Sequence, residues 1–561
     1  MALFTAAFVV ALAACGGGGG SDVSSDAPAE NDPAEPESPG NEAPETTPPV
    51  AGDPPPSGSN PTAPVTQTPA PNYPERGDPV AGVMSGTAQW PVVPIHVALT
   101  PDGRLMSFGR DPDSASDMLY DVWDWRKGFG PDAHLTLPNR VGTDLFCANQ
   151  LLLSSGEMLM TGGDTRIKTN ASSIGGQALL GNSDANVFNS DTNQITRRGQ
   201  MNQPRWYASM TALPWGEIYV QGGEIDVNTA EKAKNAEVAT EDGSSYRLLT
   251  GIDVENLFPY YPRNFVTRTG HIIGWSHNAS FRVDPRGAGS IVNFPNLPPG
   301  FELNNGSLAV MYRPGKVFLG GGGQPKAIRA DITSGEPVYE AVPDMSSPRL
   351  WGTAIVMPDG KVLIANGGNS DTSIPGATLG DPAYHVDIYD PDTNSYTRGA
   401  SMRFPRLYHS TAILLPDATV LLAGGGLPGP VTNDNGEVYY PPYLFNDDGS
   451  LATRPVIERA PTVVSPLVNF EAQVKAGDQI SQVVLVKTGA VTHSFDMDQR
   501  YVPLQFNQDG QTLSIEMSPF AADTPPGFYH LFVLNADGTP SISTIMRMNK
   551  FTGELPSLPG E

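Results

Sequence analysis

A short pattern of apolar and polar positions recurs along the middle of the chain. Each copy has an apolar strand, a tight turn, a second apolar strand and, in most copies, terminal glycines. The copies are HVALTPDGRLMSFG (96–109), NQLLLSSGEMLMTGGD (149–164), SMTALPWGEIYVQGGE (209–224), NFVTRTGHIIGWSHN (264–278), LAVMYRPGKVFLGGGG (308–323), TAIVMPDGKVLIANGG (353–368) and TAILLPDATVLLAGGG (411–426). A strand–turn–strand unit returning every 45–60 residues is typical of kelch-like β-propeller blades.

The turns of these units share one position. Six of them carry glycine there, and the seventh carries Ala418. The glycines are Gly103, Gly156, Gly216, Gly270, Gly315 and Gly360. Glycine adopts positive φ at no steric cost, so the spacing predicts a tight turn at the same place in each unit. We therefore predict an all-β fold in which residues 81–454 form a seven-bladed kelch-type β-propeller.

The repeat stops before residue 455, and the pattern changes. Shorter apolar runs follow, with turn residues between them: QVVLVKTGAVTHSF (482–495), YVPLQF (501–506), LSIEM (513–517) and FYHLFVLNADG (528–538). Short alternating strands of this kind predict a β-sandwich of immunoglobulin type over residues 455–561.

Positions nine residues before each turn position are equivalent and start the first strand of each unit. They are Pro94, Cys147, Tyr207, Tyr261, Gly306, Trp351 and His409, and Tyr408 precedes the last. The first strand of a blade lines the central channel, so these side chains are candidates for a site at its mouth. His493 lies in a predicted loop of the sandwich and joins them only if that domain covers the propeller.

Each of these residues has an ordinary structural explanation when taken singly. Tyrosine and tryptophan commonly pack between blades, and a buried cysteine behaves as a small hydrophobe. Their coincidence at one level of the propeller favours a site. Imidazole nitrogen together with phenolate oxygen suits Cu(II), whereas no pair of Cys and His residues has the spacing typical of zinc sites.

Composition and charge exclude some classes of function. Lys+Arg 34 against Asp+Glu 60 gives a net charge of −26, and no basic stripe interrupts it. Because phosphate contacts supply most of the affinity for nucleic acids, we expect no nucleic-acid partner. Residues 16–80 hold 16 of the 55 prolines, and within 16–78 there are 11 acidic residues and one basic residue. Such a segment predicts a disordered linker.

The first fifteen residues predict export. MALFTAAFVVALAA is apolar but too short to cross a bilayer as a helix, which fits a secretory signal. Cys15 follows it, as in a bacterial lipobox, so we expect residues 1–15 to be a lipoprotein-type signal and the protein to be lipid-anchored at the cell envelope. An ordinary signal peptide is the alternative. With Cys15 used as the anchor, Cys147 has no second cysteine for a disulfide and needs another explanation.

The segments DLFC (144–147), RWY (205–207), RLYHS (406–410) and VTHS (491–494) resemble those of the galactose oxidase and glyoxal oxidase family of mononuclear copper radical oxidases, and the glyoxal oxidase branch looks closer. The resemblance covers nearly all of the chain after the linker. It implies one copper ion held by Tyr207, Tyr408, His409 and His493. It also implies a thioether between Cys147 and Tyr207, which would account for the lone Cys147.

By the same resemblance, Tyr207 carries a radical that holds the second oxidising equivalent, and Tyr408 acts as the general base. The implied reaction oxidises a small aldehyde or a primary alcohol, with a carbohydrate left open, and reduces O2 to hydrogen peroxide. Family members often stack a tryptophan over the cross-linked tyrosine. Trp351 is the candidate by register, and Trp275 and Trp206 are two others.

Two other hypotheses were weighed against the oxidase. One is a copper-free kelch module that binds glycan or protein at the cell surface, since propellers serve many functions. The other is a sialidase-like hydrolase, which would need a cluster of carboxylates and arginines at the channel mouth, and none is found there. The five residues Cys147, Tyr207, Tyr408, His409 and His493 favour the oxidase. We expect a monomer.

Overall fold

The computed structural model describes residues 73–558 except 111–117, 166–179, 228, 258–259, 295–296 and 375, together with the backbone of 63–64. The predicted signal at 1–15 and nearly all of the predicted linker at 16–80 lie outside these residues. The described end of the linker is ordered, since the ring of Tyr73 lies edge-on to that of Tyr440 with centroids 5.1 Å apart and the amide of Gly77 donates to the carbonyl of Gly449 at 3.0 Å. The all-β prediction is confirmed, since the helices in the described part are single 3₁₀ turns: η1 (Trp125–Lys127), η2 (Pro131–Ala133), η3 (Pro442–Leu444) and η4 (Ala521–Asp523). No described helix is long and apolar enough to cross a membrane.

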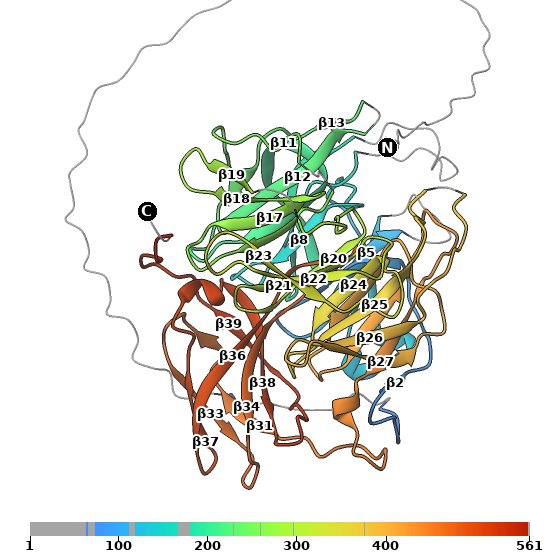
Figure 1. Cartoon of the computed structure of the whole chain (residues 1–561), viewed down its shortest axis with the longest axis vertical. Helices are drawn as coiled ribbons and strands as arrows, with labels where there is room; N and C mark the ends of the chain where they lie inside the picture. Colours follow the sequence, from blue (N-terminus) through green and yellow to red (C-terminus); the bar gives the residue numbers. More distant parts are fainter. Residues whose placement is uncertain are drawn as a thin grey trace, which may run out of the picture. The chain divides into compact units, whose positions relative to one another are not determined.

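From β4 onward the strands form successive antiparallel meanders of four (Figure 1). The first is β4 (Val93–Leu99), β5 (Leu105–Arg110), β6 (Leu119–Trp123) and β7 (His134–Pro138). The second is β8 (Asn149–Leu152), β9 (Met158–Thr161), β10 (Asn182–Asn189) and the start of β11 (Gln194–Ala212). The end of β11 begins the next, with β12 (Ile218–Asp226), β14 (Glu237–Ala239), β15 (Tyr246–Leu248) and, at the edge, β13 (Glu231–Lys232).

The later meanders repeat the same order. They are β16 (Arg263–Val266), β17 (Ile272–Ser276), β18 (Ala279–Asp284) and β19 (Ser290–Phe294); β20 (Ser307–Arg313), β21 (Lys316–Gly321), β22 (Ala327–Asp331) and β23 (Val338–Val342); and β24 (Leu350–Val356), β25 (Val362–Gly368), β26 (His385–Asp390) and β27 (Ser395–Ser401). The last sheet combines both ends of this region: β28 (Ser410–Leu414), β29 (Val420–Gly424) and β30 (Asn435–Tyr440) are completed by β2 (Val83–Met84) and β3 (Ala88–Gln89).

The turn prediction is confirmed at every one of its positions. All six glycines have φ between 70° and 101°, and Ala418 adopts the same left-handed conformation with φ 66°. The first strands of the meanders are almost wholly buried, for instance all seven residues of β4. Sheets with this alternation of buried inner strands and more exposed outer strands fit a β-propeller.

The C-terminal part packs as a sandwich around its own apolar core, which includes Val483, Leu485, Val502, Leu531 and Val533. Its strands are β31 (Ile457–Ala460), β32 (Val463–Val464), β33 (Phe470–Val474), β34 (Gln482–Lys487), β35 (Ala490–Thr492), β36 (Phe495–Asp509), β37 (Thr512–Glu516), β38 (Gly527–Leu534) and β39 (Thr544–Met548). The short β1 (Ala63–Pro64) pairs with β31.

One hairpin of the sandwich, β35 and the start of β36, leaves that core and pairs with innermost strands of the propeller-like part. β35 runs antiparallel to β4, and β36 runs parallel to β20. The hairpin therefore lies between two first strands and carries His493 among them.

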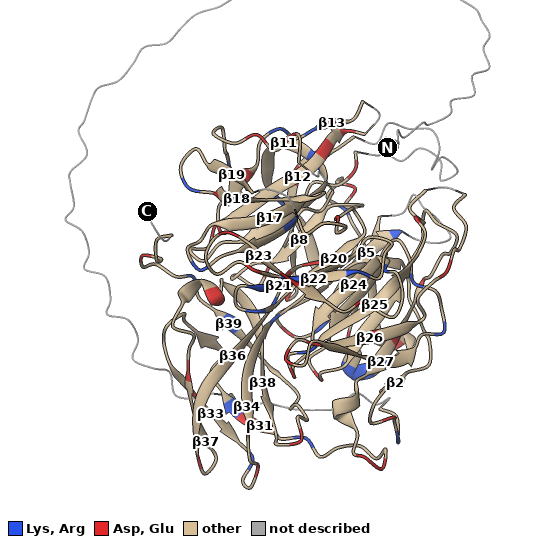
Figure 2. Ribbon diagram, in the orientation of Figure 1, with Lys and Arg blue, Asp and Glu red and all other residues tan. Residues whose placement is uncertain are grey.

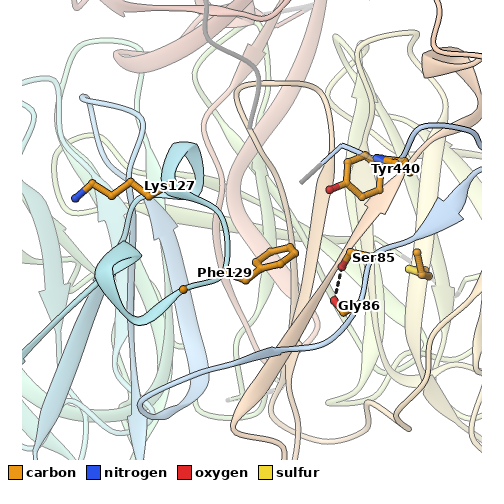
Figure 3. Close-up of a pocket in the computed structure, with 8 residues that line it drawn as sticks. Ser85, Gly86, Lys127, Phe129 and Tyr440 are labelled. Atoms are coloured by element: carbon orange, nitrogen blue, oxygen red, sulfur yellow. Dashed lines mark hydrogen bonds between the residues drawn. The ribbon is translucent and has the colours of Figure 1, made fainter. Parts of the chain in front are cut away.

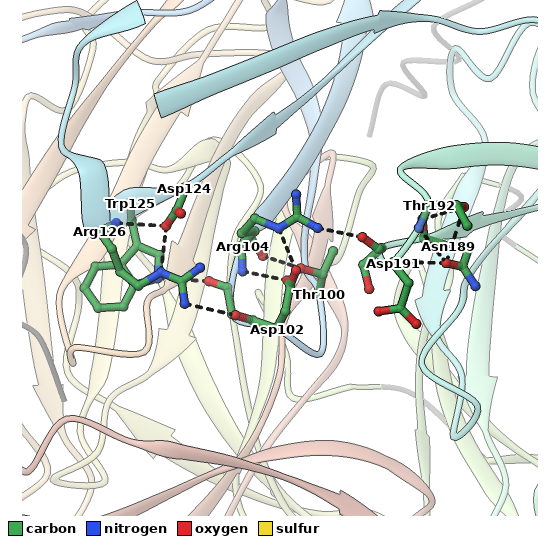
Figure 4. A network of polar contacts seen from close by, with 11 residues as sticks. Thr100, Asp102, Arg104, Asp124, Trp125, Arg126, Asn189, Asp191 and Thr192 are labelled. Atoms are coloured by element: carbon green, nitrogen blue, oxygen red, sulfur yellow. Dashed lines mark hydrogen bonds and ion pairs between the residues drawn. The ribbon is translucent and has the colours of Figure 1, made fainter. Parts of the chain in front are cut away.

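Polar contacts at the surface join neighbouring meanders (Figure 4). Arg104, in the turn after β4, pairs with Asp102 at 2.6 Å and donates to the carbonyl of Ser190, in the turn between β10 and β11, at 2.6 Å. Arg126 of η1 pairs with Asp124, which also caps that turn. Acidic and basic side chains are interspersed along the described part of the ribbon (Figure 2). The two pairs named here are partly exposed, and such pairs contribute little energy individually.

Candidate metal centre

The residues at equivalent positions of the sequence repeat share an unusual backbone conformation. Cys147, Tyr207, Tyr261, Trp351 and His409 all have φ between 43° and 73°. Non-glycine residues rarely adopt this left-handed region, and such strain concentrates at functional sites. The shared conformation shows that the repeat aligned these residues correctly.

Backbone hydrogen bonds connect these positions from one meander to the next. The amide of Tyr207 donates to the carbonyl of Cys147 at 3.1 Å, and the amide of Tyr261 donates to the carbonyl of Tyr207 at 2.7 Å. The amide of Trp351 donates to the carbonyl of Gly306 at 3.0 Å. These bonds hold the strained residues in a common layer.

Five of the predicted side chains meet in this layer. The Tyr207 and Tyr408 hydroxyls are in direct contact, and the Nε2 of His493 lies 3.1 Å from the hydroxyl of Tyr207 and 3.8 Å from the Sγ of Cys147. The rings of His409 and His493 are perpendicular, with centroids 4.6 Å apart. The potential ligand atoms of Cys147, His409 and His493 all lie within 4.8 Å of one another.

The imidazole of His409 is oriented so that one ring nitrogen is available to a metal ion. Its Nδ1 donates to the carbonyl of Gly426 at 2.8 Å, while its buried Nε2 has no hydrogen-bond partner among the described residues. Desolvation by burial lowers the pKa of His409 to about 3, so the imidazole is neutral near pH 7 and Nε2 carries a lone pair. Metal-binding histidines are commonly oriented in this way, through the other ring nitrogen.

His493 and the two tyrosines are also buried. Desolvation lowers the pKa of His493 well below its usual value, and the neighbouring His409 adds to this shift. Desolvation raises the pKa of Tyr207 and of Tyr408 well above 10, and the nearby Cys147 adds to both shifts. Without a cation, the buried phenols keep their protons. A divalent ion would reverse this preference, because it supplies the positive charge that a buried phenolate lacks.

Two imidazole nitrogens and two phenol oxygens with these contacts fit a copper ion, and one buried nitrogen already lacks a partner. The structure brings together Tyr207, Tyr408, His409 and His493, the four residues that the resemblance implies as ligands.

The three candidate tryptophans fall in different places. Trp206 lies against Tyr207, with ring centroids 3.9 Å apart and planes tilted by 59°. Trp351 meets Tyr408 edge-on at 4.7 Å, and its indole donates to Asp371 at 3.1 Å. Trp275 packs on Phe265 at 6.0 Å.

Sequence reasoning missed several neighbours of the centre. Tyr261 stacks on His493 with centroids 4.6 Å apart, and Tyr260 meets Tyr207 edge-on at 5.4 Å. Tyr260 in turn donates to Glu224 at 2.7 Å. Tyr261 was in the aligned set and could have been chosen from it. Glu224 ends the glycine-rich strand of its repeat, and nothing in the local sequence pattern indicates a role for it.

A separate hollow of 710 Å³ lies beside the 3₁₀ turns after β6 (Figure 3). Lys127, Phe129 and Tyr440 line it, together with Ser85, whose hydroxyl donates to Gly86. None of the predicted site residues lines this hollow.

Known proteins share both parts of the chain. The family model described as Glyoxal oxidase N-terminus matches residues 321–441, and the model described as Galactose oxidase-like, Early set domain matches residues 454–548. The chain is 26% identical to a galactose oxidase of Gibberella zeae over 515 residues, covering 84% of this chain and 71% of that protein. It is 26% identical to the aldehyde oxidase GLOX of Vitis pseudoreticulata over 455 residues, covering 72% of this chain and 82% of that protein.

A solved structure has the same fold. It is described as a novel fungal alcohol oxidase with catalytic diversity among the AA5 family, in complex with copper. It aligns with a TM-score of 0.73 and 23% identity over 84% of this chain and 100% of that one. The resemblance predicted from the sequence is therefore confirmed: parts of this chain match the glyoxal oxidase and galactose oxidase-like family models, and the chain is similar to galactose and aldehyde oxidases.

Proposed function

We propose that this protein is a copper radical oxidase that oxidises small aldehydes or primary alcohols with O2 and releases hydrogen peroxide. The observation that carries the proposal is the meeting of Tyr207, Tyr408, His409 and His493 in one buried layer. The kinship with galactose and aldehyde oxidases supports the same chemistry. The relatives named here are oxidases, which gives no support to the copper-free binding module.

In the proposed site the imidazoles of His409 and His493 and the phenol oxygens of Tyr207 and Tyr408 hold the ion. Copper, when bound, acidifies the substrate hydroxyl as a Lewis acid and carries one electron. The oxygen of Tyr408 accepts the proton of that hydroxyl. Tyr207 holds the second oxidising equivalent as a radical, which the alkylthio substituent from Cys147 makes easier to form.

Cys147 and Tyr207 are the proposed partners of the thioether. Both belong to the same buried apolar cluster, and the Nε2 of His493 lies near both the Sγ of Cys147 and the hydroxyl of Tyr207. Trp206, which lies against the ring of Tyr207, takes the stacking role in this proposal, and Trp351 shapes the surroundings of Tyr408.

The finer architecture is proposed with the function. The meanders, counting the last sheet closed by β2 and β3, correspond to seven propeller blades over residues 81–454, followed by an immunoglobulin-like sandwich over 455–561. Residues 1–15 form a lipoprotein signal that anchors an exported monomer, and 16–80 form its tether; nearly all of this part lies outside the described residues.

Mass spectrometry tests the proposal. The protein is expressed without copper, loaded with copper in air, denatured, alkylated and analysed as intact protein and as peptides. A thioether removes two hydrogens and joins the Cys147 and Tyr207 peptides in a form that reductants do not cleave. We expect this linkage only after copper has been added, and peroxide formation with an aldehyde or alcohol only in the linked protein. A Cys147 thiol that stays fully alkylatable in the copper-loaded protein would rule out the radical mechanism.

A further inference from the structure

Tyr207 has two aromatic neighbours that lead away from the metal centre. Trp206 contacts it at 3.9 Å and Tyr260 at 5.4 Å, and the rings of Trp206 and Tyr260 are themselves 6.3 Å apart. Tyr207 is only 5% exposed, whereas Tyr260 is half-buried. Tyr260 therefore lies between the buried phenol and the exterior of the protein.

Tyr260 is paired with a buried carboxylate. Its hydroxyl donates to the Oε1 of Glu224 at 2.7 Å. Glu224 is 3% exposed, and its Oε2 has no hydrogen-bond partner among the described residues. Burial, the largest influence on this group, raises its pKa above the usual value.

The position of Glu224 follows from the strand pairing. It stands directly opposite Trp206 in the pair β11–β12, and Lys232 of β13 is its neighbour on the other side. This pairing places Glu224 beside Trp206, where its carboxylate accepts the hydrogen bond from Tyr260. An unpaired carboxylate oxygen in a buried place is costly, because its hydration has been lost and only part of that loss is replaced.

We propose that Tyr260 and Glu224 form a one-electron relay through which outside one-electron oxidants reach Tyr207. The proposal rests on the function proposed above, in which Tyr207 carries the radical. It adds a use for two residues that are not among the proposed metal ligands.

The relay works in two balanced steps. An outer-sphere oxidant removes one electron from Tyr260, and the phenolic proton moves along the 2.7 Å hydrogen bond to Glu224. This gives a neutral Tyr260 radical, a protonated Glu224 and the reduced oxidant. Tyr260 then takes one electron from the Tyr207 phenolate and regains its proton from Glu224. The net change is one electron moved from Tyr207 to the oxidant, with Tyr260 and Glu224 restored.

The proton acceptor makes Tyr260 suitable for one-electron oxidation. An oxidised phenol is a strong acid, so its oxidation is easy only where the proton has a place to go. The carboxylate of Glu224 is already in hydrogen-bond contact and needs no rearrangement. Phenylalanine at 260 cannot be oxidised in this way, and glutamine at 224 cannot take the proton.

The test uses the full-length, copper-loaded enzyme in its one-electron-reduced form, in which Tyr207 carries no radical. Ferricyanide is added in a stopped-flow instrument, and radical formation is followed by optical absorption and by electron paramagnetic resonance. We expect Tyr260→Phe and Glu224→Gln each to slow activation about tenfold, with the reduction potential of Tyr207 unchanged. A relay alters the rate of electron transfer and leaves the equilibrium as it was.

Tyr339→Phe is the matched control. Tyr339 is also half-buried and hydrogen-bonded, but its partner is the indole of Trp275, at 3.1 Å. This variant should be activated at the wild-type rate. Activation of both relay variants at the wild-type rate, or a slowing accompanied by a shifted potential, would overturn the relay. If the wild-type enzyme forms no radical at all, it is the proposed function that fails.

Discussion

At the scale of single residues, the metal centre depends on backbone strain. A left-handed φ at a non-glycine residue costs about 1–3 kcal/mol, and five residues of the repeat register adopt it together: Cys147, Tyr207, Tyr261, Trp351 and His409. An ordinary extended residue at the start of a strand would direct its side chain between the sheets. The strained conformation redirects it, and the backbone hydrogen bonds between neighbouring meanders keep it there.

Tyr408 provides the first prediction at this scale. Its hydroxyl contacts that of Tyr207, so it is in position to accept a proton from a hydroxyl bound at the same place. Tyr408→Phe keeps the buried ring and removes the oxygen. We expect turnover to fall by about 10²–10⁴-fold, the usual contribution of a positioned base, and peroxide release from a primary alcohol measures it.

Tyr384→Phe is the control for this change, because Tyr384 is 37% exposed and belongs to no described cluster at the centre. It should leave turnover unaltered. A Tyr408→Phe variant with full activity would show that the proton goes elsewhere.

At the scale of strands, three meanders share a buried arginine just before the strained residue. Arg205, Arg349 and Arg406 each donate to a carbonyl near the end of the neighbouring strand, that of Gly222, Asn366 or Gly424. Each also pairs with a carboxylate of the third strand, Glu237, Asp387 or Glu437, at 2.8–3.0 Å. The arginine thus ties the first, second and third strands together at the level of the metal centre.

These pairs predict a large loss of stability when only one partner is changed. Glu237 accepts hydrogen bonds from Arg205 and from the amides of Asn202 and Gln203, and both charged side chains are fully buried. Glu237→Gln leaves the buried guanidinium uncompensated, which typically costs about 3–5 kcal/mol. The free energy of unfolding in urea should fall by that amount.

An exposed ion pair in the same meander gives the comparison. The Nζ of Lys234 and the Oδ2 of Asp253 are 3.4 Å apart, and both side chains are at least half-exposed. Lys234→Met should change the free energy of unfolding by less than about 1 kcal/mol. Equal effects of the two changes would mean that the buried pair contributes no more than a surface one.

The repeats could be predicted because each strand–turn–strand unit has a recognisable pattern in its own local sequence. A glycine at the turn and an apolar run on either side can be recognised without knowledge of the rest of the chain. Counting back from the turn position then identifies Cys147 and His409 as equivalent residues. Even Ala418, which lacks the glycine signal, was placed by its neighbours and adopts the expected φ. The buried arginines also left a signal, since they recur two or three residues before the strained position.

The contacts between repeats could not be predicted in this way. Trp351 stands at a register position and Trp206 directly precedes one, and the local pattern does not tell which of them lies against Tyr207. The hydrogen bond from Tyr260 to Glu224 joins the second strand of one meander to the segment before the next meander. Such contacts depend on how the sheets are placed, which no local pattern records.

At the scale of the whole molecule, the centre is assembled from both parts of the chain. Three of the proposed ligands come from the propeller-like part, and His493 arrives on the hairpin of β35 and β36. The carboxylate of Asp496 accepts the amides of Ala490, Asp498 and Gln499 and so closes the base of this hairpin. The site therefore exists only when the sandwich is docked, which couples copper binding to the fold of the entire protein.

Buried histidines make this fold sensitive to acid. His530 of β38 is a useful case because it lies in the sandwich and is not a proposed ligand. Its Nδ1 lies 2.8 Å from the Oγ of Ser543, its Nε2 has no hydrogen-bond partner in the described part of the chain, and burial lowers its pKa to about 3.

Acid lowers the stability of the folded protein through His530, because the folded and unfolded states bind different numbers of protons there. Between about pH 6.5 and pH 3 the unfolded chain binds a proton on His530 and the folded protein does not. The unfolded state is therefore stabilised relative to the folded state as pH falls. Each pH unit in this window removes about 1.4 kcal/mol from the free energy of unfolding. His530→Gln, which cannot be protonated, should lose that much less stability per pH unit than the wild type. Urea unfolding of both proteins at pH 6 and pH 4 measures the difference.

The raised pKa of Asp496, about 6, acts in the opposite direction but is present in both proteins and cancels. Identical pH slopes for the two proteins would mean that His530 is protonated in the folded state, and that the sandwich core admits water at this position.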